Sequence, residues 1–223
     1  MPRIKIISTG GTIVNTRNGL IGVEELLRDI PEAYEWADFD IAEVTRLRGG
    51  SIRLDQWMAI ARSVNEAAND PAIDGVILTH GTFTLEETVY FLHLCVPLSK
   101  PTVCVASQRT HDSIGNDGDR NFLDAIRVVL SPDAAEKVVL VVLHEEIHSA
   151  RDVVKSNRRP GGFVSLLPPE TIGGEAMLCA IRGTGRTLDF ALREASETGR
   201  RLYLLFVREQ RYMTEQDTSG KWQ

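Results

Sequence analysis

Two short segments of the chain place threonine hydroxyls beside glycines, and one lysine lies far downstream. The segments are Thr9-Gly10-Gly11-Thr12 and His80-Gly81-Thr82, and the lysine is Lys155. A threonine hydroxyl attacks a carbonyl carbon when a neighbouring group, such as an amine of lowered pKa, takes its proton. Glycines expose backbone N–H groups that stabilise the resulting oxyanion. The pattern therefore indicates nucleophilic catalysis, although either loop alone is also typical of a plain strand-to-helix turn.

The elements that position these residues follow an alternating pattern. Short β-branched runs, several of them continuously apolar, predict parallel strands covered on both faces at residues 4–8, 41–44, 75–79, 102–105 and 138–143. Helical periodicity lies between them, at residues 57–64 and 122–129 for example. Thr84 and Glu87 have the spacing of a capping box, which predicts a helix starting directly after Phe83.

This alternation predicts an α/β fold with a doubly wound, mostly parallel sheet of the Rossmann or flavodoxin type. Ligands of such sheets bind at the carboxyl ends of the strands. The two threonine loops, the loop around Ser107 and the segment containing Lys155 all follow predicted strands. We therefore expect these residues to meet at one edge of the sheet.

The composition argues against two classes of binding partner, nucleic acids and membranes. The 223 residues include 25 basic and 31 acidic side chains, giving a net charge of −6, which argues against a nucleic-acid partner. Three widely spaced cysteines, Cys95, Cys104 and Cys179, form no disulfide framework and favour a cytoplasmic location. The longest apolar run, residues 138–143, is far below the roughly 18 residues that span a bilayer, so no membrane partner is expected.

One motif points to different chemistry. His144-Glu145-Glu146-Ile147-His148 satisfies the zinc-protease pattern, which needs a helix so that both imidazoles share one face. Here the motif directly follows a predicted strand, so we interpret it as a polar strand-exit loop and expect no metal site.

Four motifs carry a resemblance to a known family. Residues 8–13 (Ser-Thr-Gly-Gly-Thr-Ile) and 80–88 are similar to the first and second signatures of the bacterial-type L-asparaginases, and residues 116–118 and 151–157 match that family in order. The resemblance covers residues 1 to about 173. It implies the family's N-terminal α/β domain and a small amide substrate such as asparagine. It also implies a homo-oligomer that needs no cofactor.

The resemblance also assigns roles. Thr12 corresponds to the family's nucleophile, and Thr82 with Lys155 corresponds to two members of its second triad. The substrate-binding positions that it implies are Gly11, Ser51, Gly81, Phe83 and Ser107.

The sequence departs from the family at several positions. Phe83 stands where the family has the aspartate that completes the triad and grips the substrate's amino group. The lid tyrosine is missing from residues 14–21, and Gly49 occupies the place of a substrate-binding serine, with Ser51 nearby. The family's C-terminal domain, which completes a neighbouring subunit's pocket, has no counterpart here. These departures predict impaired turnover of asparagine.

After a stretch rich in glycine and proline, residues 174–223 return to the alternation of strand and helix patterns. They predict a strand at 177–181, a turn at 183–185, a helix at 187–197 and a strand at 202–207. This segment resembles the opening β–α–β unit of the universal stress protein family, which binds ATP or dimerises. Alternatively, these elements simply extend the first sheet. We expect domains at 1–173 and 174–223.

Two functions stay open from the sequence. The first is an amidohydrolase that cleaves the side-chain amide of asparagine or a related small amide through a threonine nucleophile. The second is a catalytically degenerate module that binds a small ligand, with a stress-protein-like appendage.

Overall fold

The computed structural model describes residues 1–47, 52–135, 137, 139–156, 162–165, 176–181 and 201–206. The chain divides into two compact units, Met1–Leu167 and Pro168–Gln223.

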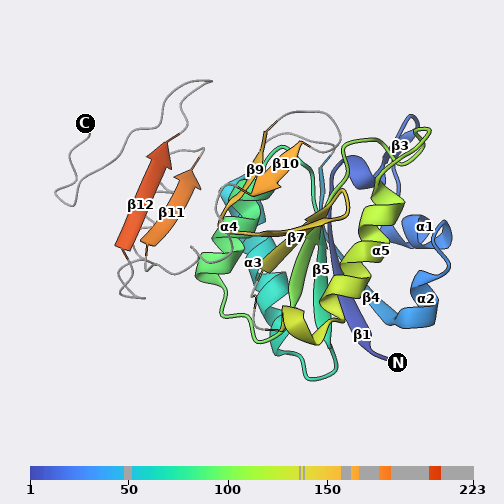
Figure 1. Cartoon of the computed structure of the whole chain (residues 1–223), viewed down its shortest axis with the longest axis horizontal. Helices are drawn as coiled ribbons and strands as arrows, with labels where there is room; N and C mark the ends of the chain where they lie inside the picture. The colour runs from blue at the N-terminus through green and yellow to red at the C-terminus, as the bar shows by residue number, and fades with distance from the viewer. Residues whose placement is uncertain are drawn as a thin grey trace. The chain divides into compact units, whose positions relative to one another are not determined.

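The first unit is built on a six-stranded sheet (Figure 1). Its strands, in spatial order, are β4 (Asp38–Leu47), β1 (Arg3–Gly10), β5 (Gly75–Thr79), β6 (Thr102–Val105), β7 (Val139–Leu143) and β8 (Glu146–Ser149). The first five are parallel, and β8 pairs antiparallel with β7. The predicted mostly parallel sheet is therefore confirmed.

Helices cover both faces of this sheet (Figure 1). One face carries α1 (Val23–Arg28), α2 (Ala33–Trp36) and α5 (Gly118–Val129), and the other carries α3 (Leu54–Asn69) and α4 (Leu85–Cys95). Ile6 of β1 and Phe122 of α5 are fully buried in the core between the sheet and the first helix layer. Across the other layer, the Trp57 indole N–H donates to the Thr88 hydroxyl at 2.8 Å and so joins α3 to α4.

Smaller elements complete the unit. They are the 3₁₀ turns η1 (Thr12–Val14) and η2 (Pro132–Ala134), the hairpin β2–β3 (Asn15–Thr16 and Gly19–Leu20) and the antiparallel pair β9–β10 (Val153–Lys155 and Phe163–Ser165).

The connections define where a ligand should bind. After β1 the chain passes over the face of α1 and α2, whereas after β5 it passes into α4 on the opposite face (Figure 1). β1 and β5 are hydrogen-bonded neighbours, with Ser8 opposite Thr79. Neighbouring strands whose connections leave to opposite faces mark the topological switch point, where a crevice forms outside the carboxyl ends. Both threonine loops lie at this point.

Two local expectations need correction. Thr84 is the N-cap residue of α4, but its side chain makes no cap hydrogen bond, so the predicted Thr84–Glu87 capping box is wrong although the helix starts where expected. β4 runs from Asp38 to Leu47, well beyond residues 41–44. It is an edge strand in which no residue is fully buried, and polar residues such as Asp38 and Arg46 near its ends hide them from a search for apolar runs.

The second unit contains two described strands, β11 (Ala176–Ile181) and β12 (Arg201–Phe206). They pair in parallel in a two-stranded sheet of their own, with Ala176 opposite Arg201. Parallel neighbours need a crossover connection, as a β–α–β segment has. The helix and turn predicted between them, at 187–197 and 183–185, lie outside the described residues.

Candidate active site

The two threonine loops cross in direct backbone contact. Gly11 has φ 90° and ψ −176°, and its N–H donates to the Leu47 carbonyl at 2.7 Å. A Cβ on Gly11 would come within 2.5 Å of the Gly81 nitrogen, and one on Gly10 within 2.4 Å of the Leu47 oxygen. Only glycine permits this conformation and this approach. The crossing brings the residues that follow, Thr12 and Thr82, to the same end of the sheet.

We expect Gly11→Ala to destabilise the fold by about 2–5 kcal/mol, because the new Cβ adds backbone strain to a clash that no side-chain movement relieves. Gly115→Ala is the matched control. Gly115 also has a positive φ, 66°, but the atom nearest to a Cβ at this position would be an Arg109 nitrogen 3.7 Å away. Its substitution should cost about 1 kcal/mol. Denaturant unfolding of both variants checks this, and equal losses would show that the close approach to Gly81 is unimportant.

Lys155 reaches the second threonine loop. Its Nζ lies 2.6 Å from the Thr82 Oγ1 and 3.3 Å from the Thr82 carbonyl oxygen. The Lys155 backbone N–H donates to a Glu86 carboxylate oxygen at 2.9 Å, which ties β9 to the first turn of α4. Phe163, opposite Lys155 in β10, holds its ring centroid 5.8 Å from Nζ. The β9–β10 pair therefore places the Lys155 amine against Thr82, although the two residues are 73 positions apart in the sequence.

Thr12 opens the 3₁₀ turn η1 directly after the glycine pair and is partly exposed. The preceding strand end is fixed by Thr9, which is buried and whose hydroxyl donates to the Thr79 carbonyl at 2.8 Å. A partly exposed hydroxyl on a fixed turn is accessible to a small molecule. Of the sequence-predicted trio, the structure thus brings Thr82 and Lys155 into hydrogen-bond contact and sets Thr12 on the loop that crosses beside them.

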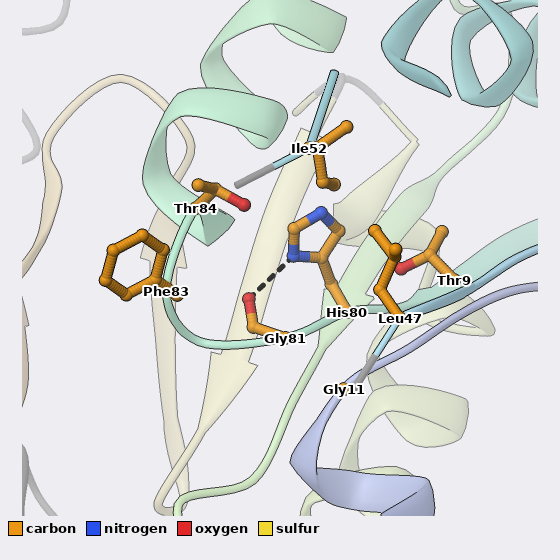
Figure 2. A pocket seen from close by; sticks show the side chains of 8 residues that line it. All are labelled: Thr9, Gly11, Leu47, Ile52, His80, Gly81, Phe83 and Thr84. Carbon is orange, nitrogen blue, oxygen red and sulfur yellow. Dashed lines mark hydrogen bonds between the residues drawn. The ribbon is translucent and has the colours of Figure 1, made fainter. Parts of the chain in front are cut away.

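A small cavity lies where the loops cross (Figure 2). It is partly open to solvent and offers about 10 Å³, room for one water-sized group. Its described lining consists of Thr9, Gly11, Leu47, Ile52, His80, Gly81, Phe83 and Thr84. Phe83 is 48% exposed, so a large apolar ring faces solvent at the cavity's rim. Leu47, Ile52 and Phe163 are site neighbours that the motifs did not predict.

His80 stands at the centre of this lining (Figure 2). It is 1% exposed, and its Nδ1 lies 2.7 Å from the Gly81 carbonyl oxygen, as expected for a hydrogen-bonded turn histidine. A carbonyl only accepts, so Nδ1 carries the hydrogen and Nε2 is an acceptor. Nε2 is buried without a hydrogen-bond partner. Burial lowers the pKa of His80 from 6.5 to about 4, although its bond to Gly81 opposes the shift, and the ring is therefore neutral at pH 7.

The lowered pKa of His80 predicts acid sensitivity. Below about pH 6.5 the unfolded chain takes up a proton at this histidine, whereas the folded chain does so only near pH 4. Stability should therefore fall as the pH drops through this window, by about 3 kcal/mol from this group. We expect the free-energy difference between wild type and His80→Gln to shrink by that amount between pH 7 and pH 4 in denaturant unfolding. Parallel pH profiles for the two proteins would contradict this.

The remaining predicted substrate positions are less informative. Ser107 is fully buried, and its hydroxyl donates to the Arg109 carbonyl at 2.7 Å, so it holds the loop after β6. Its contact with a substrate stays a prediction. Ser51 lies outside the described residues.

The His-Glu-x-x-His motif is not helical. His144 and Glu145 form the turn between β7 and β8 with φ of 53° and 63°, and Glu146 and His148 belong to β8. The His144 Nε2 lies 3.1 Å from the Gln108 Oε1. A hairpin cannot give the shared helical face of the zinc-protease pattern. Within the described part of the chain, no group of three or more His, Cys, Asp or Glu side chains is placed to hold a metal ion.

Comparison with known proteins shows the family of the chain. A family model described as "Asparaginase, N-terminal" matches residues 3–166, which is most of the chain and contains both threonine loops and Lys155. The chain belongs to the asparaginase family. The predicted resemblance is thereby confirmed.

Individual members of the asparaginase family support this assignment. L-asparaginase 2 of Bacillus subtilis (strain 168) is 36% identical over 167 residues, covering 70% of this chain and 44% of that protein. Glutaminase-asparaginase of Pseudomonas fluorescens biotype A is 35% identical over 165 residues, covering 70% and 46%. The crystal structure of a probable cytoplasmic L-asparaginase from Campylobacter jejuni matches with a TM-score of 0.70 at 33% identity, covering 74% and 52%.

This asparaginase-family chain spans about half the length of the relatives it matches. In the part that the structure describes, no helix is both long and apolar enough to cross a membrane.

Proposed function

We propose that the chain is an amidohydrolase of the asparaginase type, which cleaves a small carboxamide through Thr12. The observation that carries this proposal is the 2.6 Å contact between the Lys155 amine and the Thr82 hydroxyl, beside the crossing that presents Thr12. The β9–β10 pair and the hydrogen bond from the Lys155 backbone N–H to the Glu86 carboxylate position Lys155 so that its amine reaches this hydroxyl, an arrangement suited to proton transfer. The names of the related proteins, L-asparaginase and glutaminase-asparaginase, support the same reaction class.

The proposed reaction has two stages. The Thr12 oxygen bonds to the amide carbon as its proton passes to the Thr82–Lys155 pair, and the carbonyl π electrons move to an oxyanion held by backbone N–H groups of the crossing loops. The Gly11 N–H already donates to Leu47, so these donors come from the adjoining peptides. Collapse breaks the carbon–nitrogen bond, and the nitrogen leaves as ammonia with the returned proton. Water then cleaves the Thr12 ester and gives the carboxylate.

Ammonia release by the 223-residue chain tests the proposal. We expect release from small carboxamides at neutral pH, equimolar with the carboxylic acid product, after treatment with a chelator. The background rate comes from Thr12→Ala. Release that does not exceed this background would overturn the proposal.

One observation favours a second candidate, a non-catalytic ligand-binding module. Phe83 presents an exposed ring beside Thr82, and a phenyl ring cannot accept a proton. Under this alternative, ligands bind but wild type and Thr12→Ala release ammonia equally slowly.

Other features remain predictions. They include a cytoplasmic location, assembly into a homo-oligomer, and the likeness of residues 174–223 to a stress-protein segment. The departures at Phe83 and residues 14–21 still lead us to expect slow turnover of asparagine itself.

A further inference from the structure

We propose that Asp112 is a positioning residue for Thr12, because its carboxylate holds the β2–β3 hairpin in the place that closes the Thr12 turn. This inference rests on the proposed function, in which Thr12 bonds to the substrate. Asp112 lies in the loop between β6 and α5. It acts on Thr12 through backbone hydrogen bonds of η1 and of the hairpin.

The Thr12 turn is closed by the first residue of the hairpin. Thr12 opens η1, and Asn15, which caps this turn, donates its backbone N–H to the Thr12 carbonyl. The Asn15 carbonyl in turn accepts the His111 backbone N–H at 2.9 Å. On the other side of Thr12, the Gly11 N–H is bonded to Leu47. The position of the Thr12 hydroxyl therefore depends on where Asn15 is held.

The hairpin has little stability of its own. Its two strands contain two residues each, and none of residues 15–22 is fully buried. The Thr16 hydroxyl donates to the Gly19 carbonyl at 2.8 Å, and this bond stays within the hairpin. An isolated two-stranded hairpin is at best marginally stable in water. Contacts with a neighbouring segment must therefore hold the hairpin in place.

Asp112 supplies such a contact. Its Oδ2 accepts the backbone N–H of Arg17, at the hairpin tip, at 2.9 Å and lies 3.6 Å from the Arg17 Nε. The Thr110 hydroxyl donates to the other carboxylate oxygen at 3.0 Å and so fixes its orientation. The bond from the Arg17 N–H lowers the pKa of Asp112, so the carboxylate is charged at neutral pH. Hydrogen bonds to a charged acceptor are stronger than those between neutral groups.

The loop that carries Asp112 is bound to two helices. The His111 Nε2 lies 2.8 Å from an oxygen of Asp29, the residue that caps α1, and its Nδ1 lies 3.4 Å from an oxygen of Asp119 in the first turn of α5. The Asp117 carboxylate accepts two backbone N–H groups of the same loop at 2.9 and 2.8 Å. Figure 1 shows the hairpin beside this loop, above the start of α5. The loop is therefore a fixed support against which Asp112 holds the hairpin.

Amide hydrogen exchange of the 223-residue chain, followed by NMR, tests the inference. In Asp112→Ala we expect the Asn15 N–H to exchange at least about tenfold faster than in wild type, because the released hairpin opens more often. This N–H bonds to the Thr12 carbonyl and not to Asp112, so a purely local effect of the substitution would leave it unchanged. Unchanged exchange of Asn15, or faster exchange confined to Arg17, would overturn the inference.

Two further variants control for folding and for charge. Asp112 lies on the surface, and the amide of Ile77 in the buried strand β5 should therefore exchange at the wild-type rate in every variant. Asp112→Asn keeps an oxygen that accepts the Arg17 N–H, so it should restore most of the protection of Asn15. Asp40→Ala removes an exposed carboxylate that pairs with Lys5 and should leave Asn15 unaffected. Equal exchange of Asn15 in Asp112→Asn and Asp112→Ala would contradict the role of this acceptor.

The kinetics of ammonia release measure the effect on Thr12. In Asp112→Ala we expect kcat to fall by about tenfold while KM changes by less than about twofold, because a displaced nucleophile slows the chemical step. Asp112→Asn should recover most of this loss. A wild-type kcat in Asp112→Ala, despite faster exchange of Asn15, would overturn the positioning role.

The two readouts separate this inference from the proposed function. If wild type releases no more ammonia than Thr12→Ala while the exchange of Asn15 responds to Asp112→Ala, the proposed function fails and the support of the turn by Asp112 stands. If ammonia is released through Thr12 but Asn15 does not respond, the inference alone fails.

Discussion

Replacing Thr12 with alanine should lower kcat for carboxamide hydrolysis by about 10³-fold or more, because the variant lacks the atom that bonds to the substrate. The substitution removes a partly exposed side chain at the start of η1, and the backbone that crosses Gly81 stays intact. Stability should therefore change little while activity collapses. Steady-state ammonia release and denaturant unfolding on the same preparations measure the two effects.

Thr12→Ser is the matched control for this prediction. Serine keeps an oxygen at the same position, so its activity should exceed that of Thr12→Ala by at least about tenfold. If both variants retain the wild-type rate, Thr12 has no part in the chemistry.

Replacing Lys155 with methionine should lower kcat by about 10²–10⁴-fold, the range that a positioned acid–base group contributes. Methionine has a similar length and keeps contact with the Phe163 ring, but it can neither donate nor accept the proton shared with Thr82 across 2.6 Å. The Lys155 backbone bond to Glu86 is unaffected by the change of side chain. Lys5→Met is the control, because Lys5 pairs with Asp40 at 3.0 Å between β1 and β4 and lies outside the site.

A double-mutant cycle sharpens the Lys155 prediction. If Thr82 and Lys155 act as one proton-transfer unit, Thr82→Val combined with Lys155→Met should be no slower than the slower single variant. Losses that multiply would mean that the two side chains act separately.

The sheet can be predicted from the sequence because its central strands are continuously apolar. The strands predicted at residues 75–79 and 102–105 have the same bounds in the structure, since parallel strands buried on both faces leave a run of β-branched residues. The edge strands are harder to predict. β8 begins with Glu146 and β4 with Asp38, and polar residues on the exposed side of an edge strand interrupt the pattern.

The site is predictable in part for a similar reason. Gly11 and Gly81 stand in motifs that follow buried strands, so their meeting at the switch point follows from topology. Phe163 and Leu47 could not be anticipated. Phe163 reaches the site through the β9–β10 strand pair, which lies in a segment rich in glycine and proline. Leu47 reaches it from the C-terminal end of the edge strand β4. Neither residue has a sequence pattern that specifies its pairing partner.

The proposed mechanism requires that Thr12, rather than Thr82, bonds to the substrate. Acid quenching of the chain during turnover of a slowly hydrolysed carboxamide, followed by peptide mass mapping, tests this most directly. We predict an acyl adduct on the peptide containing Thr12, which is lost in Thr12→Ala and accumulates more when deacylation is slowed. An adduct on the peptide containing Thr82, with ammonia release undiminished in Thr12→Ala, would contradict the mechanism.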